Sequence, residues 1–188
     1  MASAREIQTR MKSIQDTMKI TNAMYMISSA KLKKARKNLE NTEPYFHMLQ
    51  GTIARMIRHL PKVEHRYFEA EETDDTQLKK RGYIVIAADK GLAGAYNHNV
   101  VKLTEECLKQ GQDNLVFAVG ELGRDYFIQH KIPVYKEFHY TVQDPNMSRA
   151  RDITECILSL YDEQKLDEVY VIYTYSVNSM QVETRLQR

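Results

Sequence analysis

The chain has 188 residues, 43% of them hydrophobic, and a formal net charge of +2, a composition typical of a folded protein with one or two domains. Two cysteines are too few for a disulfide framework, and we expect Cys107 and Cys156 to be reduced and partly buried in helices. No apolar run approaches the ~20 residues of a membrane-spanning helix, and the first residues lack the apolar segment of a signal peptide.

Apolar residues recur at alternating spacings of four and three through the first forty residues, where no glycine or proline interrupts a helix. This period of 3.5 residues keeps one stripe facing a partner when two helices wind around each other, so it predicts a coiled-coil helix. Small or polar residues at three of the positions weaken the pattern, and an ordinary bundle helix is the alternative. We call this stripe the seam: Ile7, Met11, Ile14, Met18, Thr21, Tyr25, Ser28, Leu32, Ala35 and Leu39.

A second apolar stripe, between Ile20 and Ala30, makes the middle of this helix apolar over most of its circumference, which is typical of a helix surrounded by protein. The first forty residues also carry nine basic and three acidic side chains, and nine minus three leaves six positive charges. Such a cluster can contact phosphates or an acidic protein surface, or it can simply be solvated.

We expect Pro44 to interrupt or kink the helix, because proline lacks a backbone donor. Apolar residues at helical spacing from Phe46 to Leu60 then predict a second helix, which Pro61 closes. Acidic residues cluster between Glu69 and Asp75 and are followed by three basic residues, a pattern that predicts a solvated linker. These patterns divide the chain into a helical shaft with a second helix (1–61), a charged linker (62–81) and an α/β domain (82–188).

From Gly82 onward, short apolar strands alternate with amphipathic helices, which predicts a Rossmann-like domain with a parallel sheet. We expect strands at 83–88, 115–119, 134–140 and 169–175, the third at a sheet edge, and one more strand at 180–185 beside the last. Helices are expected around residues 100–108, 122–128 and 148–161, and Ser148 is a candidate cap for the last. The fold class is therefore α/β, with a long N-terminal coiled-coil helix joined to this domain.

The turn after the first strand, DKGLAGAYN at 89–97, invites a nucleotide-binding interpretation but matches neither GxGxxG nor the P-loop pattern. We expect tight strand-to-helix geometry, with Gly91, Gly94 and Asn97 as structural residues. The six histidines show no metal-ligand spacing, and no base or nucleophile is marked beside Asp89. The sequence thus predicts no catalytic residue, no cofactor and no metal, and it argues against an independent enzyme.

Three segments, which begin with REIQTRMKSIQ, GYIVIAADKG and VNSMQVETRL, resemble the gamma subunit of F-type ATP synthases. The opening REIQTRMKSIQDTMKITNAMYMISSAKLKKA, with its hallmark KITNAM at 19–24, is similar to the N-terminal shaft helix of that family. GYIVIAADKGLAGAYNHNV resembles the first strand and turn of the family's α/β domain, and VNSMQVETRL is similar to the end of that domain. The similarity extends in the same order along the whole chain.

The resemblance implies a central-stalk rotor of a proton-translocating ATP synthase, whose shaft turns inside a ring of alternating alpha and beta subunits. It implies a non-catalytic subunit, since the ATP sites belong to the beta subunits, with the epsilon subunit and the membrane c-ring as further partners and no nucleic acid. It also implies a peripheral position at the cytoplasmic face of a bacterial plasma membrane, without a direct membrane span. The residues implied at the alpha and beta collar are Lys19, Ile20, Thr21, Met24, Ile27 and Lys31.

In this family the chain continues past the position of Arg188 and returns as a second shaft helix, so we expect the seam to lack that partner here. Three outcomes are open: the helix folds back on residues 46–60, pairs weakly with another copy, or frays. We expect weak pairing, because the second helix is too short to cover the seam and the basic residues of two copies repel. A coiled-coil adaptor without motor function, binding protein or nucleic acid, is the alternative function, and a dehydrogenase-like enzyme is a more distant one.

Overall fold

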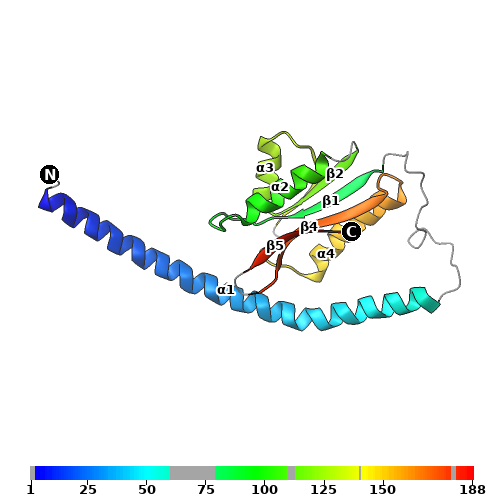
Figure 1. Cartoon of the computed structure of the whole chain (residues 1–188), viewed down its shortest axis with the longest axis horizontal. Helices are drawn as coiled ribbons and strands as arrows, with labels where there is room; N and C mark the ends of the chain where they lie inside the picture. Colours follow the sequence, from blue (N-terminus) through cyan, green and yellow to red (C-terminus); the bar gives the residue numbers. More distant parts are fainter. Residues whose placement is uncertain (1–2, 60–78, 110–112, 140, 179–180) are drawn as a thin grey trace. The chain divides into compact units, whose positions relative to one another are not determined.

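The computed structural model describes residues 3–59, 79–109, 113–139, 141–178 and 181–188 (Figure 1). The chain divides into two compact units, residues 1–71 and residues 72–188. The first unit contains α1 (Ala4–His59), and the second is an α/β domain with the remaining described helices and strands. The predicted fold class, a long helix joined to an α/β domain, is confirmed. The predicted linker falls mostly on residues 60–78, outside the described residues, so its boundaries stay a prediction.

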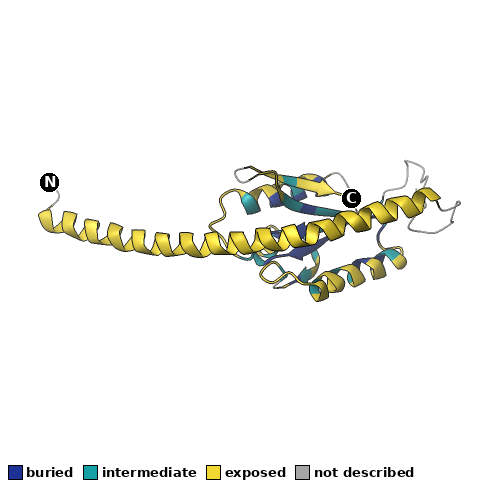
Figure 2. Cartoon of the chain, turned by 90° about the horizontal axis from the view of Figure 1, so that it is seen from below, coloured by how far each residue is buried: buried dark blue, intermediate teal, exposed yellow. Residues whose placement is uncertain are grey.

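α1 is one helix of 56 residues that continues through Pro44 (Figure 1). This corrects the prediction of two helices separated at that residue, and it excludes a fold-back of the seam onto residues 46–59, which extend the same helix. Proline removes one backbone donor and crowds the preceding turn. The residues on both sides of Pro44 are exposed, so water can satisfy the backbone carbonyl that the missing donor leaves free. No described residue of α1 is buried (Figure 2).

The sheet has the strand order β3-β2-β1-β4-β5. β1 (Arg81–Ile86), β2 (Asn114–Val119), β3 (Val134–Phe138) and β4 (Glu168–Ser176) run parallel, and β5 (Val182–Gln187) pairs antiparallel with β4. These strands confirm the predicted alternation, although β1 begins two residues before the predicted strand. β3 lies at an edge, as its charged pattern predicted. Tyr140 and Met180, which were predicted in strands, lie outside the described residues.

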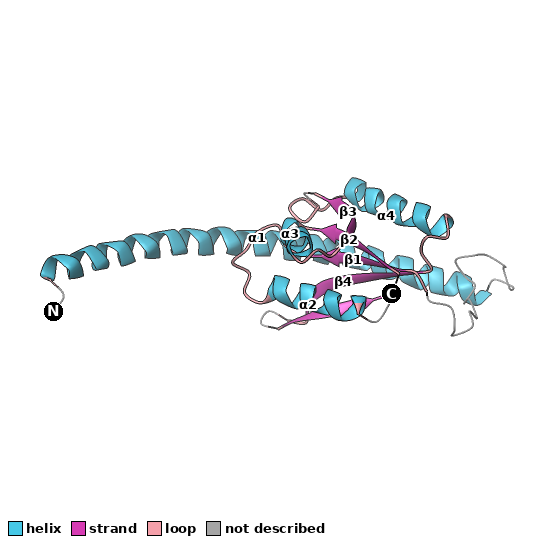
Figure 3. Ribbon diagram, turned by 90° about the horizontal axis from the view of Figure 1, so that it is seen from above, coloured by secondary structure: helices cyan, strands magenta, loops and turns pink. Residues whose placement is uncertain are grey.

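Helices cover both faces of the sheet (Figure 3). α2 (Tyr96–Leu108) and α3 (Glu121–Gln129) pack on one face, and α4 (Met147–Asp162) packs on the other. Side chains alternate along β2: Val116 and Ala118 belong to the cluster on the face covered by α2 and α3. Phe117 and Val119 belong to the cluster on the face covered by α4. α4 is capped by Asn146, whose Oδ1 accepts from the Arg149 amide at 3.0 Å. Ser148 therefore lies inside the helix that it was predicted to cap.

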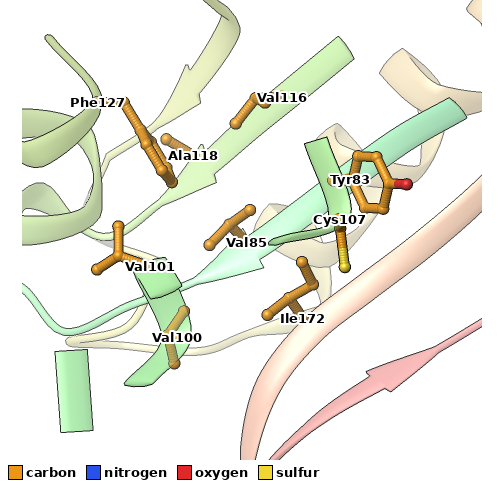
Figure 4. Packing of buried hydrophobic residues seen from close by; sticks show 9 residues of the cluster. All are labelled: Tyr83, Val85, Val100, Val101, Cys107, Val116, Ala118, Phe127 and Ile172. Atoms are coloured by element: carbon orange, nitrogen blue, oxygen red, sulfur yellow. The ribbon is translucent and has the colours of Figure 1, made fainter. Parts of the chain in front are cut away.

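The domain has its own apolar core. The cluster under α2 and α3 joins side chains from three strands and both helices (Figure 4). Cys107 belongs to this cluster and is buried, whereas Cys156 in α4 is half-buried, and both cysteines are free. The cluster consists of Tyr83, Val85, Val100, Val101, Cys107, Val116, Ala118, Phe127 and Ile172.

Gly120, between β2 and α3, generates a stability prediction. Its φ is +104°, and a Cβ added there would collide with the carbonyl oxygen of Ala87. We expect Gly120→Ala to lower the free energy of unfolding of this domain by more than about 2 kcal/mol, because the substitution adds both a clash and a strained φ. Urea denaturation followed by circular dichroism measures this change. Gly91→Ala is the matched control, since no heavy atom lies within 4 Å of its added Cβ, and an equal loss in both variants would contradict the prediction.

Candidate functional site

The seam of α1 is exposed to solvent along its whole length. Its large side chains have exposed fractions between 50% for Ile7 and 71% for Tyr25. Apolar side chains in a regular stripe are ordinarily buried against a partner, because each Å² removed from water contributes about 25 cal/mol. α1 therefore presents a long apolar contact surface, which is the first candidate functional site.

The spacing of the seam continues beyond Leu39, a feature that the sequence analysis missed. Thr42, Phe46, Leu49, Ile53 and Met56 follow at steps of three and four, in the register of the preceding residues. The signal was present in the sequence, but a helix break assumed at Pro44 concealed it. Because α1 is continuous, these residues and the seam form one stripe, which at 1.5 Å per residue spans about 70 Å.

The residues that the resemblance implied at the collar lie together on α1. Ile20, Met24, Ile27 and Lys31 follow each other at steps of four, three and four, so they share a face beside the seam. Lys19 pairs with Asp16 at 3.1 Å, a contact between two exposed side chains. The Thr21 hydroxyl donates to the carbonyl of Thr17 at 2.9 Å, so its hydrogen bond is made within the helix. These residues and the seam together make the middle of α1 apolar on two adjacent faces.

The turn after β1 is held by polar contacts at both of its ends. The backbone amide of Ala88 donates to Asn97 Oδ1 at 2.8 Å, and Asp89 Oδ1 accepts from the Glu121 amide at 3.2 Å. Gly94 has a φ of +56°, as a structural glycine would. Gly91 differs from its predicted role, since its φ is outside the left-handed region and its surroundings are open. The left-handed conformation falls instead on Leu92, with a φ of +62° and an exposed fraction of 93%.

This turn is poorly suited to a nucleotide phosphate. In a dinucleotide-binding fold, amides at a helix N-terminus face the pyrophosphate. At this edge of the sheet, beside the turn that leads to α2, the first amide of α3 donates to the side chain of Asp89, whose other oxygen, Oδ2, is buried without a hydrogen-bond partner. A phosphate at this point would meet a carboxylate, so the geometry agrees with a structural turn.

Two further features of the described residues were candidates for a polar site. Within the part of the chain that the structure describes, no group of three histidine, cysteine or acidic residues could hold a metal ion. A groove of about 570 Å³ lies between β3 and α4, but its lining mixes Lys136 and Arg149 with Asp152 and Glu155. Such mixed charge selects neither anions nor cations. No helix in the described ranges is long and apolar enough to cross a bilayer.

Comparisons with known proteins identify the family. A family model described as ATP synthase matches residues 3–188. The chain is 50% identical to the ATP synthase gamma chain of Acetivibrio thermocellus and 46% identical to that of Ruminiclostridium cellulolyticum, in both cases over 97% of its length. The chain belongs to the ATP synthase gamma chain family. It is also 34% identical, over 95% of its length, to the sodium-ion-specific ATP synthase gamma chain of Acetobacterium woodii.

The chain matches only part of these relatives, since its alignments span 61%, 62% and 57% of their respective lengths. Among solved structures, the central stalk and c-ring of the Tetrahymena thermophila mitochondrial ATP synthase gives a TM-score of 0.69 at 22% identity. That match covers 89% of this chain and 70% of the other. A chain of the Euglena gracilis enzyme gives a TM-score of 0.51 at 16% identity, with 81% and 55% covered. These structures support the fold.

The exposed seam generates a prediction about self-association. We expect a weak dimer whose fraction rises with ionic strength, because salt screens the repulsion between the basic helices of two copies. Leu32→Glu, in the seam, should abolish it, whereas Met26→Glu adds the same charge away from the seam and should not. Sedimentation velocity at low and high salt measures the dimer fraction. A monomer at every salt concentration, with α1 fully helical by circular dichroism, would refute pairing.

Proposed function

We propose that this chain is the central-stalk rotor subunit of a proton-translocating F-type ATP synthase. In this proposal α1 forms the shaft inside a ring of alpha and beta subunits, and its rotation couples proton flow to ATP synthesis or hydrolysis. The ATP sites belong to the beta subunits, and this chain is the non-catalytic partner that moves between them. Family membership supplies the context, and the physical observation that carries the proposal is the helix itself.

A helix of 56 residues without a buried side chain is difficult to explain in an isolated protein. At 1.5 Å per residue it is about 84 Å long, several times the width of a small domain. An isolated amphipathic helix gains most of its stability from packing of its apolar face. The exposed seam and second stripe therefore support a partner on each of two faces, as a shaft enclosed by a collar would have.

The chemistry of the proposed collar contact favours rotation over permanent attachment. Ile20, Met24 and Ile27 offer apolar side chains without charge pairs, so no single strong interaction would fix one angular position. Methionine repacks against different surfaces at little cost, because its side chain is unbranched. Lys31 begins a basic run, residues 31–37, that suits acidic segments on the surrounding subunits. We place Lys19, Ile20, Thr21, Met24, Ile27 and Lys31 at this contact.

The α/β domain has a core independent of the shaft, which supports its assignment as a foot outside the catalytic ring. We propose that this foot contacts the epsilon subunit and the membrane c-ring. The complex would then hold the chain at the cytoplasmic face of a bacterial plasma membrane as a peripheral subunit. The bacterial origin of its relatives supports this location.

Affinity capture from membranes of the native cell tests the proposal. The tagged chain should be recovered with alpha and beta subunits in amounts that survive a salt wash, because the apolar contacts strengthen rather than weaken with salt. Triple replacement of Ile20, Met24 and Ile27 by Ser, which removes apolar area without changing charge, should reduce recovery. Capture of nucleic acid that is lost on raising salt, without alpha or beta subunits, would favour the adaptor alternative that the basic run supports.

Replacement of a collar residue should change coupling in the assembled enzyme. Met24→Lys places a cation on the apolar face of the shaft, where it can bond a carboxylate of a facing beta subunit and hold one rotary state too strongly. In a complex that contains the full-length gamma chain, we expect the ratio of proton pumping to ATP hydrolysis to fall several-fold. Membrane vesicles with a pH-sensitive dye measure this ratio. Met26→Lys is the control for an added charge, and equal effects of both variants would contradict the placement of Met24.

A further inference from the structure

Glu168, the first residue of β4, is a buried carboxylate surrounded by cations. Its side chain is only 6% exposed. Oε1 lies 3.1 Å from Lys79 Nζ and 3.6 Å from Arg188 Nη1, and Oε2 lies 3.2 Å from Arg81 Nε. The hydroxyl of Tyr170 donates to Oε2 at 2.9 Å. Three segments distant in the sequence thus meet at one carboxylate.

The residue before Glu168 binds the same segment through its backbone. Asp167 Oδ2 accepts from the Lys80 amide at 2.7 Å, and the Asp167 amide donates to the Lys80 carbonyl at 2.8 Å. The Glu168 amide donates to this carbonyl as well, at 3.2 Å. Lys79, Lys80 and Arg81 are therefore held by side-chain and backbone contacts together. These three basic residues, which the charge pattern predicts in the solvated linker, therefore contact the α/β domain.

The electrostatics favour the charged form of this cluster. Burial works to raise the pKa of Glu168, but hydrogen bonds from Lys79 and Tyr170 and the charges of Lys79 and Arg188 outweigh it and keep that pKa below its ordinary value. Glu168 consequently stabilises the domain at pH values above the ordinary carboxyl range. This contribution is lost as the pH falls through the lowered pKa.

These contacts lie where a force on the connection from α1 would enter the sheet. Residues 79–81 are where the chain that leaves α1 at His59 joins the sheet, at the start of β1. β1 is the central strand, paired in parallel with β2 on one side and β4 on the other. Tension along the connection from α1 therefore acts first on residues 79–81 and then along β1, where two ladders of hydrogen bonds resist shear.

We propose that Asp167 and Glu168 form an anchor that transmits force between the connection to α1 and the sheet. Its role in torque transfer rests on the proposed rotor function, in which shaft and foot turn as one body against resistance. The anchor passes a pull on the backbone of residues 79–81 to a buried carboxylate and to the central strand. Glu168 is thus a positioning residue for the transmission of rotation.

Single-molecule pulling on this chain tests the anchor in two directions. Handles at His59→Cys and Leu92→Cys direct the force through residues 79–81 and β1. Handles at Leu92→Cys and Gln129→Cys load the same domain without passing through those residues. Cys107→Ala and Cys156→Ser are introduced in every variant so that only the handles react.

In the first geometry, we expect Glu168→Gln to raise the rate of opening at constant force by about tenfold or more, because it removes the buried charge that pairs with the half-buried cations of Lys79 and Arg81. In the second geometry, the increase should stay below about threefold. Glu163→Gln is the matched control, since its 2.6 Å pair with Lys165 is exposed and should matter in neither direction. Lys79→Gln, which removes one contact and keeps the carboxylate, serves if Glu168→Gln does not fold.

An increase in the opening rate that is large in the first geometry and small in the second would support the anchor. An equal increase of the opening rate in both geometries would mean that Glu168 only stabilises the domain in general, and it would overturn the proposal. An unchanged opening rate in both geometries would overturn it as well. Because these measurements need only this chain, their failure would leave the rotor proposal intact. Failure to capture alpha and beta subunits would instead refute the rotor proposal. The mechanical anchor would then still be measured, but it would have no role in torque transfer.

Discussion

α1 presents apolar stripes along its length but buries none of its residues against the described part of the chain, and the proposed function depends on this fact. A helix that buries none of its 56 residues depends on packing from outside for most of its stability. Its seam, its second stripe and its basic run all lie on this one element. The proposed function of this chain therefore depends on the contact surfaces of α1, and the subunits proposed to cover them are those of an ATP synthase.

The α/β domain differs from α1, since it buries its apolar side chains in clusters of its own. Parallel strands are buried on both faces, so helices must cover both sides of the sheet. The turn after β1, which superficially suggests a nucleotide site, is occupied by contacts of Asp89 and Asn97 that hold two helices against the strand ends. A fold widely used for nucleotide binding has a structural turn here, which agrees with the rule that function depends on the site and not on the fold.

At the start of β1, inside the second unit, buried charge replaces apolar packing as the main contact. Glu168 and Asp167 bind residues 79–81, at the start of β1, through ion pairs and backbone hydrogen bonds. A buried carboxylate is costly to leave unpaired, so such a cluster is held together more firmly than exposed ion pairs of equal length. In the proposed rotor, a domain that turns with a helix needs a firm attachment, and the buried charge of Glu168 would provide one without enlarging the core.

The sequence alone determined the long helix, the order of strands and helices in the domain, and the family, because these depend on local periodicity and on contiguous motifs. It misjudged Pro44, since a single proline predicts a break only where no other helical residues continue the pattern, and here the spacing from Thr42 to Met56 does. The strand order and the antiparallel β5 required the tertiary structure, because pairing brings together residues that no local pattern connects. The same holds for the anchor: Lys79 and Glu168 are 89 residues apart, and only the pairing of β1 with β4 places one against the other.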